Sequence, residues 1–313
     1  MKDELVDIKG LGEASIEKLK EIGVETLISL ATQNPTEMAN VTGIGEKQCR
    51  KFINEANEKC QLGFETATEF TKKREKYSKI STGYLPFDEM LEGGFEQGHI
   101  SEVHGATGKG KSQLSHLMVV RALMNNKTDK SLYIDTENTF SKERISDFAK
   151  ANKLDIKNTL NRIKIARAYN FDNQVLLIKK VEEMLQKDSN YRILVIDSLT
   201  AHMRSEFSGR GQLADRQAKL NKHMHDIMRI ADIYNLVVII TNQILSNPAM
   251  MYGNPEMPVG GNILSHNCGT MIYFRGGTGG CTKAIVVDST KLPKNECEFF
   301  ITKDGFSEKK QSI

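Results

Sequence analysis

The sequence predicts an α/β protein with a mostly parallel, twisted sheet, preceded by a small all-α domain. Two patterns carry this prediction. From residue 80 onward, short apolar runs alternate with amphipathic stretches, as expected for βαβ crossovers that cover a sheet on both faces. Residues 1–60 show only helical periodicity. We expect a helical domain at 1–60, a linker at 61–79 and the sheet domain at 80–313.

The alternation also gives the expected elements of the sheet domain. Strands are expected at 99–104, 131–135, 162–166, 193–197, 236–241, 270–274, 283–288 and 298–302. Helices are expected at 111–125, 142–151, 172–186 and 213–234. We expect antiparallel strands to extend the parallel sheet near the C-terminus.

Composition is that of a globular protein rather than a disordered or collagen-like one, with 39% hydrophobic and 27% charged residues. No apolar run approaches the roughly 20 residues of a membrane-spanning helix, and the first residues lack the apolar core of a secretion signal. We therefore expect a cytoplasmic protein without a membrane partner. The five cysteines are widely spread and form no CxxC pair, so reduced thiols are favoured over a disulfide framework or a zinc cluster.

Two similar glycine turns punctuate the helical segment, IKGLG at 8–12 and VTGIG at 41–45. In each turn the glycines permit a tight fold and leave backbone N–H groups at a helix N-terminus, a geometry suited to a phosphate oxygen. The repeat resembles a pair of helix-hairpin-helix units, which bind the DNA backbone without reading its sequence. Plain tight connections between helices are the alternative.

Charge is unevenly distributed along the chain. Residues 1–60 hold 8 basic and 11 acidic side chains, a net charge of −3. The remaining residues carry a net charge of +6, which gives the overall net charge of +3. If the protein binds nucleic acid, most of the electrostatic attraction must come from the larger part of the chain.

The strongest local signal is a phosphate-binding loop that fits GxxxxGK[ST]. It follows an expected strand and opens an expected helix, which is the context that the motif requires. The loop glycines would let backbone N–H groups surround the phosphates, Lys111 would bridge the β- and γ-phosphates, and the Ser112 hydroxyl would ligate Mg²⁺. The loop consists of Gly105, Ala106, Thr107, Gly108, Lys109, Gly110, Lys111 and Ser112.

Polar residues follow three other expected strands at the same edge of the sheet. Asp197 ends an apolar strand and would hold magnesium through water, although buried strands also end in Asp at ordinary turns. Glu137 lies just past the end of another strand and outside the helix start at Ser141, so it could orient and deprotonate an attacking water. Gln243 could sense the γ-phosphate, or it could simply be a satisfied side chain at a strand terminus.

Together, in order and over nearly the whole chain, these motifs resemble the RecA-type strand-exchange recombinases. The matching text includes GFETATEF, YIDTENTF, LVIDSLTAHMRSEFSGRGQLADRQ, VVIITNQI and PVGGNILSH. The resemblance implies a RecA-like P-loop ATPase core that uses ATP and Mg²⁺. It also implies filaments on single-stranded DNA, pairing with homologous double-stranded DNA in recombination and repair, and contacts with mediator or paralogue proteins.

The resemblance assigns further residues. Phe64 and Ala67 would form a Phe-x-x-Ala polymerisation motif that inserts into a neighbouring subunit, the alternative being packing against the chain's own ATPase domain. The first DNA-binding loop would be residues 204–211, with Arg204 and Arg210, and Arg216 would lie just beyond it. The second would be the stretch 245–258, which leads to Gly260, Gly261 and Asn262. The nucleotide would lie between subunits. Arg144 and Pro293 would flank the adenine, Asp288 would cap the nucleotide from the neighbouring subunit, and His266 would couple the γ-phosphate to the second loop. The further nucleotide contacts would be Gln113, Arg144, Asp288, Pro293 and His266.

The sequence departs from the family pattern at three places that bear on the rate of ATP turnover. Asn138 stands where a Gly usually follows the catalytic Glu, Lys109 occupies a loop position usually held by a small residue, and the run 290–293 lacks an earlier proline. The expected activity is DNA-dependent ATP hydrolysis by a strand-exchange recombinase. The alternatives are a paralogue or regulatory ATPase that binds nucleotide and a protein partner without exchanging strands, and, less favoured, a kinase.

Overall fold

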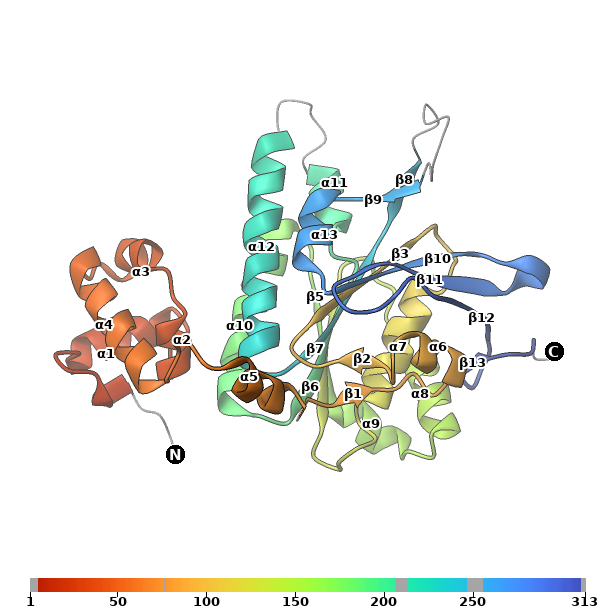
Figure 1. Ribbon diagram of the computed structural model, residues 1–313, viewed down its shortest axis with the longest axis horizontal. Coiled ribbons are helices and arrows are strands. Elements are labelled where there is room, and N and C mark those ends of the chain that lie inside the picture. The colour runs from red at the N-terminus through yellow and green to blue at the C-terminus, as the bar shows by residue number, and fades with distance from the viewer. Residues whose placement is uncertain (1–4, 76, 207–212, 247–255, 311–313) are drawn as a thin grey trace. The chain divides into compact units, whose positions relative to one another are not determined.

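The computed structural model describes residues 5–75, 77–206, 213–246 and 256–310. The chain divides into two compact units, Met1–Lys76 with Lys179–Ser189, and Tyr77–Ile178 with Asn190–Ile313. The predicted fold class is confirmed: helices alone form the N-terminal part, and a large mixed sheet flanked by helices forms the rest (Figure 1). Within the described ranges, no helix has the length and apolar character needed to cross a membrane.

The N-terminal helices pack around a small apolar core. They are η1 (Leu5–Asp7), α1 (Glu13–Glu21), α2 (Leu27–Ala31), α3 (Pro35–Thr42) and α4 (Glu46–Lys59). Leu19, Leu30 and Phe52 are almost completely buried in that core. The two glycine turns of the sequence repeat end directly at the N-termini of α1 and α4, as predicted, and neither helix has a side-chain cap.

The segment expected to be a linker contains a helix of its own, α5 (Ala67–Arg74). Thr66 caps it: its hydroxyl accepts from the Glu69 N–H at 3.2 Å, and the Glu69 carboxylate accepts from the Thr66 N–H at 2.9 Å. This Thr-x-x-Glu capping box was readable in the sequence, and it places Ala67 at the first position of the helix.

The large sheet has nine strands in the order β13-β12-β11-β10-β3-β7-β6-β4-β5. The five pairings from β10 to β5 are parallel, and the three from β13 to β10 are antiparallel. The strands are β3 (Ile100–Gly105), β4 (Lys130–Asp135), β5 (Ile163–Arg167), β6 (Tyr191–Asp197), β7 (Val237–Asn242), β10 (Thr270–Gly276), β11 (Thr282–Ser289), β12 (Glu296–Ile301) and β13 (Phe306–Ser307). All eight predicted strands are present, with ends shifted by two residues or fewer.

Two small two-stranded antiparallel sheets were not predicted because their strands are too short to show a period. They are β1 (Lys79–Ile80) with β2 (Phe95–Glu96), and β8 (Ile244–Ser246) with β9 (Glu256–Pro258). β8 and β9 lie at the two ends of the stretch expected to be the second DNA loop.

The remaining helices connect the strands. They are α6 (Leu85–Met90), α7 (Lys111–Arg121), α8 (Lys142–Ala151), α9 (Ile156–Arg162), α10 (Phe171–Lys187), α11 (Ala201–Glu206), α12 (Leu213–Ile233) and α13 (Asn262–Asn267). The predicted helix 111–125 was too long. Its end tightens into three-residue turns, with the Leu123 N–H on the Val120 carbonyl and the Met124 N–H on the Arg121 carbonyl.

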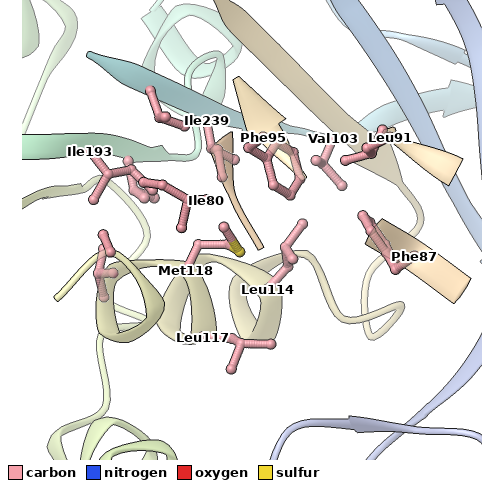
Figure 2. Packing of buried hydrophobic residues seen from close by; sticks show 14 of the residues in the cluster. Ile80, Phe87, Leu91, Phe95, Val103, Leu114, Leu117, Met118, Ile193 and Ile239 are labelled. Carbon is pink, nitrogen blue, oxygen red and sulfur yellow. The ribbon is translucent and has the colours of Figure 1, made fainter. Parts of the chain in front are cut away.

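Helices cover both faces of the central strands, with α7 and α8 on one face and α12 on the other (Figure 1). On the first face, Leu114 and Met118 of α7 pack against Val103, Ile193 and Ile239 of three neighbouring strands (Figure 2). All five are buried, and each contributes about 1.5–3 kcal/mol by leaving water. This packing fixes the helix that follows β3 against the sheet.

Burial of His223 makes stability depend on pH. This side chain of α12 is 1% exposed, and burial lowers its pKa to about 4. Its Nε2 lies 3.1 Å from the amide nitrogen of Gln174, which can only donate, so the ring is held neutral.

We therefore predict that the free energy of unfolding includes a His223 contribution that is lost as pH falls from about 6.5 to 4, since only the unfolded chain then takes up the proton. In urea unfolding, the stability difference between wild type and His223→Gln should shrink by up to about 1.4 kcal/mol per pH unit in that range. A difference that stays constant with pH would contradict the assignment.

Candidate nucleotide-binding site

The predicted phosphate loop lies between the end of β3 and the start of α7. At Gly105, where a Cβ would lie 2.2 Å from the Phe274 carbonyl oxygen, only glycine fits. Gly110 adopts a left-handed conformation (φ 93°) at the N-cap of α7 and provides no side-chain cap. The first backbone N–H groups of α7 thus have no side-chain acceptor at the cap, and together with the helix dipole they suit an anionic phosphate.

Lys111 is bent back over this loop. Its Nζ donates to the carbonyl oxygens of Gly105 at 2.8 Å and Ala106 at 3.0 Å. Burial lowers the pKa of Lys111, while the nearby carboxylates of Asp197 and Glu137 act in the opposite direction. A cation is therefore held where the predicted phosphate-binding and carboxylate residues converge.

Asp197 at the end of β6 is 3% exposed and surrounded by hydroxyl donors. It accepts from Thr241 Oγ1 at 2.5 Å, Tyr133 Oη at 2.7 Å and Thr139 Oγ1 at 3.2 Å. Burial, followed by the charge of Asp197, raises the pKa of Tyr133 well above its usual value, so the phenol stays a donor. The oriented carboxylate and the hydroxyl of Ser112 supply oxygen donors of the kind that Mg²⁺ takes.

Glu137 lies just beyond β4 and is bonded to two neighbouring strand ends. Its Oε1 accepts from Ser198 Oγ at 3.0 Å and from Gln243 Nε2 at 2.9 Å. The Gln243 Oε1 in turn accepts from Arg204 Nη1 of α11 at 3.2 Å. The sequence placed Arg204 in a DNA loop and Gln243 at the nucleotide, and the structure joins them in one chain of hydrogen bonds.

Ser198 was not singled out from the sequence. It directly follows Asp197, so its position at the strand edge was visible, but its bond to Glu137 depends on the β4–β6 register, which pairs Asp135 with Asp197. Without knowledge of that register, a Ser that follows a strand-terminal Asp does not indicate a functional role.

Arg144 of α8 joins the start of α7 to the C-terminal strands. Its Nε donates to Gln113 Oε1 at 2.5 Å, and its other nitrogens donate to the carbonyls of Thr302 and Lys303 at 2.6 and 2.9 Å. The guanidinium also lies 4.0 Å from the Phe148 ring centroid. Ser141 caps α8 by accepting from the Arg144 N–H, as its sequence position predicted.

Three residues that the resemblance assigned to the nucleotide are not gathered at this chain's own phosphate loop. Asp288 pairs with Met271, whereas Gly105 pairs with Phe274, so Asp288 lies three residues, about 10 Å, back along the strands. Pro293 lies beyond it, and both are exposed. His266 is exposed on α13, and among the described residues no hydrogen bond links it to the loop.

The expected DNA loops are described in part. Arg204 is exposed and Arg216 is half-buried, whereas Arg210 and residues 247–255 lie outside the described residues, as does the side chain of Asn262. Arg216, Gly260 and Gly261 line one open groove. The structure therefore brings residues of both predicted loops to one surface.

Two departures from the family pattern have a local explanation. Asn138 has a φ of 60°, a left-handed conformation that glycine adopts without strain and that Asn tolerates better than most residues. The Lys109 side chain extends toward Gly276, where a Cβ would lie 3.1 Å from its Nζ. The ammonium thus passes over a glycine of β10.

Fold and site together define a P-loop ATPase architecture of the RecA-like type. The family model described as Rad51 matches residues 73–309, and the model described as a SAM-like helix-hairpin-helix tandem matches residues 2–58. The chain therefore belongs to the Rad51 family of RecA-type recombinases, and it carries an N-terminal helix-hairpin-helix domain.

The backbone at Asn138 gives a prediction that needs no ligand. Asn138→Gly should leave the free energy of unfolding unchanged or raise it, whereas Asn138→Val should lower it by about 1–2 kcal/mol, because a β-branched residue is strained at positive φ. Urea unfolding at neutral pH measures both. Equal stability of the two variants would show that the left-handed turn is not formed.

Proposed function

We propose that this protein is an ATP-dependent DNA strand-exchange recombinase of the archaeal RadA type. It forms helical filaments on single-stranded DNA, pairs that strand with homologous duplex, and hydrolyses ATP with Mg²⁺. Membership of the Rad51 family supports the general class. The observation that carries the specific proposal is the chain Glu137–Gln243–Arg204, since a bond from an ATPase carboxylate to a DNA-loop arginine serves little purpose in an enzyme whose ATPase does not respond to DNA.

In the proposed reaction, Glu137 orients the attacking water and accepts its proton. Ser198 and Gln243 fix the Glu137 carboxylate by donating to Oε1. Lys111 moves from the loop carbonyls to the β- and γ-phosphates. Ser112 would hold Mg²⁺ directly and Asp197 would hold it through water, and the ion would supply charge neutralisation at the phosphates.

DNA contacts come from the groove shared by the two loops. Arg204, Arg210 and Arg216 bind phosphates, while Gly260, Gly261 and Asn262 let the backbone approach the strand. Guanidinium contacts to phosphates carry no sequence information, so base pairing between strands directs the exchange. Affinity therefore falls steeply with salt.

Assembly uses the exposed anchor residues before the core. Phe64 is fully exposed, and Ala67 begins the capped helix α5. Two exposed apolar side chains of the sheet domain support an acceptor site there: β5 is the last strand in the sheet order, and Ile165 on it and Leu176 on α10 are about half exposed. We propose that Phe64 and Ala67 of one copy dock at this edge of the next.

Such stacking would complete the nucleotide site. Asp288 and Pro293, which lie away from their own phosphate loop, would then contact the nucleotide held by a neighbouring copy. Arg144 would contribute to the adenine pocket from the same chain as the loop, and His266 would connect the γ-phosphate to the second DNA loop.

The test of this function is joint-molecule formation between single-stranded DNA and homologous duplex with ATP and Mg²⁺. Wild type should form joint molecules, and Glu137→Gln should bind ATP but hydrolyse it at least about 10²-fold more slowly. Glu89→Gln, at an exposed residue of α6, is the control and should behave as wild type. DNA-independent nucleotide binding without joint molecules would instead favour a paralogue or regulatory ATPase.

The anchor assignment has its own test. Phe64→Glu should abolish multimers on size-exclusion chromatography while the core remains folded by circular dichroism, because a carboxylate cannot enter an apolar pocket. Leu62→Glu, an exposed apolar residue of the same segment, should still multimerise. Unchanged elution of Phe64→Glu would refute the anchor role.

A further inference from the structure

A buried polar cluster lies on the sheet face opposite α7, and the nucleotide site does not use it. Val103 faces α7, so its neighbours Glu102 and His104 face the other way. In the parallel register, His104 lies directly opposite Asn242 of β7. Glu102 and Asn242 are 0% exposed, which makes their pairing obligatory.

The Asn242 side chain ties three parts of the chain together. Its Nδ2 donates to Glu102 Oε1 at 2.7 Å and to the Val259 carbonyl at 2.7 Å, and its Oδ1 accepts from Thr200 Oγ1 at 2.6 Å. Thr200 immediately precedes α11, which carries Arg204, and Val259 immediately precedes Gly260. One amide therefore connects the strand of the phosphate loop to the stems of both DNA loops.

These stems also position Arg204 and Gln243, the two residues that link Glu137 to the DNA surface by hydrogen bonds. The Arg204 N–H donates to the Thr200 carbonyl at 3.1 Å, and the Val259 N–H donates to the Gln243 carbonyl at 3.0 Å. Displacement of Thr200 or Val259 would therefore move the two residues that connect Glu137 to the DNA surface.

Glu102 is positioned to keep a proton. Its Oε2 and the Nδ1 of His104 are 3.9 Å apart, and both atoms are buried with no hydrogen-bond partner among the residues that the structure describes. Burial raises the pKa of Glu102 to about 7, and burial, with Lys111 nearby, lowers that of His104 to about 4. Among the described residues, the Tyr273 ring stacks on His104 with the ring centroids 5.5 Å apart, and burial together with Glu102 raises the thiol pKa of Cys268. Burial thus favours the protonated form of the Glu102 carboxyl and the neutral form of the His104 imidazole that faces it.

We propose that Glu102 and Asn242 act as a positioning unit, which holds the stems of both DNA loops so that DNA binding is communicated through Arg204 and Gln243 to the ATPase. The unit is most stable when Glu102 is protonated, because ionisation would bury a charge to which, among the described residues, the Asn242 amide alone donates, and burying that charge costs more than the one bond returns. This inference rests on the proposed function and assigns the residues that couple its two activities.

The test compares ATP hydrolysis with and without single-stranded DNA. Thr200→Val, which removes the hydroxyl donor at nearly constant volume, should lower the DNA-stimulated to DNA-free ratio about fivefold or more through kcat, with the KM for ATP unchanged. Thr200→Ser should restore the ratio. Ser131→Ala removes a buried hydroxyl of β4 bonded to the Val119 carbonyl, and this control should lower Tm without changing the ratio.

The proton is tested by the pH profile. In wild type the ratio should fall as pH rises through about 7, where Glu102 ionises, whereas Glu102→Gln, which mimics the protonated carboxyl, should keep a flat ratio. If DNA stimulates ATP hydrolysis by wild type, but Thr200→Val keeps the wild-type ratio and Glu102→Gln keeps the wild-type pH profile, the positioning role is overturned and the proposed function is not. A wild type without DNA stimulation would contradict the proposed function and the inference with it.

Discussion

The parallel register of β3, β7, β6 and β4 is the constraint on which the rest of the site depends. It pairs His104 with Asn242 and Asp135 with Asp197, so the four strands end at a common edge. A slip of one residue in β6 would turn Asp197 to the opposite face. The hydrogen bond from Ser198 to Glu137 would be lost with it, because Ser198 directly follows Asp197.

Alternation along these strands separates two tasks. One face carries the hydroxyl shell of Asp197 and packs against α7, which begins with Lys111 and Ser112. The other face carries the Glu102–Asn242 unit and leads to the DNA-loop stems. The two faces meet at the strand ends, where Gln243, the residue after Asn242, bonds to Glu137. Asn242, the last residue of β7, thus bonds to Glu102, and Gln243 directly after it bonds to Glu137.

Sequence periodicity was sufficient for eight strands of the large sheet, since short apolar runs that alternate with amphipathic stretches are distinctive. It missed α5, although Thr66 and Glu69 spell its capping box, and it missed β1 and β2, which are held by tertiary pairing. Motifs identified Lys111 and Glu137, but the bond from Gln243 to Arg204 joins residues distant in sequence. Glu102 gave no signal either, because a lone acidic residue in an apolar strand is interpretable only once its partner is known.

In the proposed assembly, one copy supplies the phosphate loop and the next copy completes the nucleotide site. Electron cryomicroscopy of the protein on single-stranded DNA with a slowly hydrolysed ATP analogue can show this arrangement. We expect a helical filament with nucleotide between protomers, Lys111 and Glu137 on one side and Asp288 of the neighbour on the other. Nucleotide enclosed by one protomer, with Asp288 facing solvent, would contradict it.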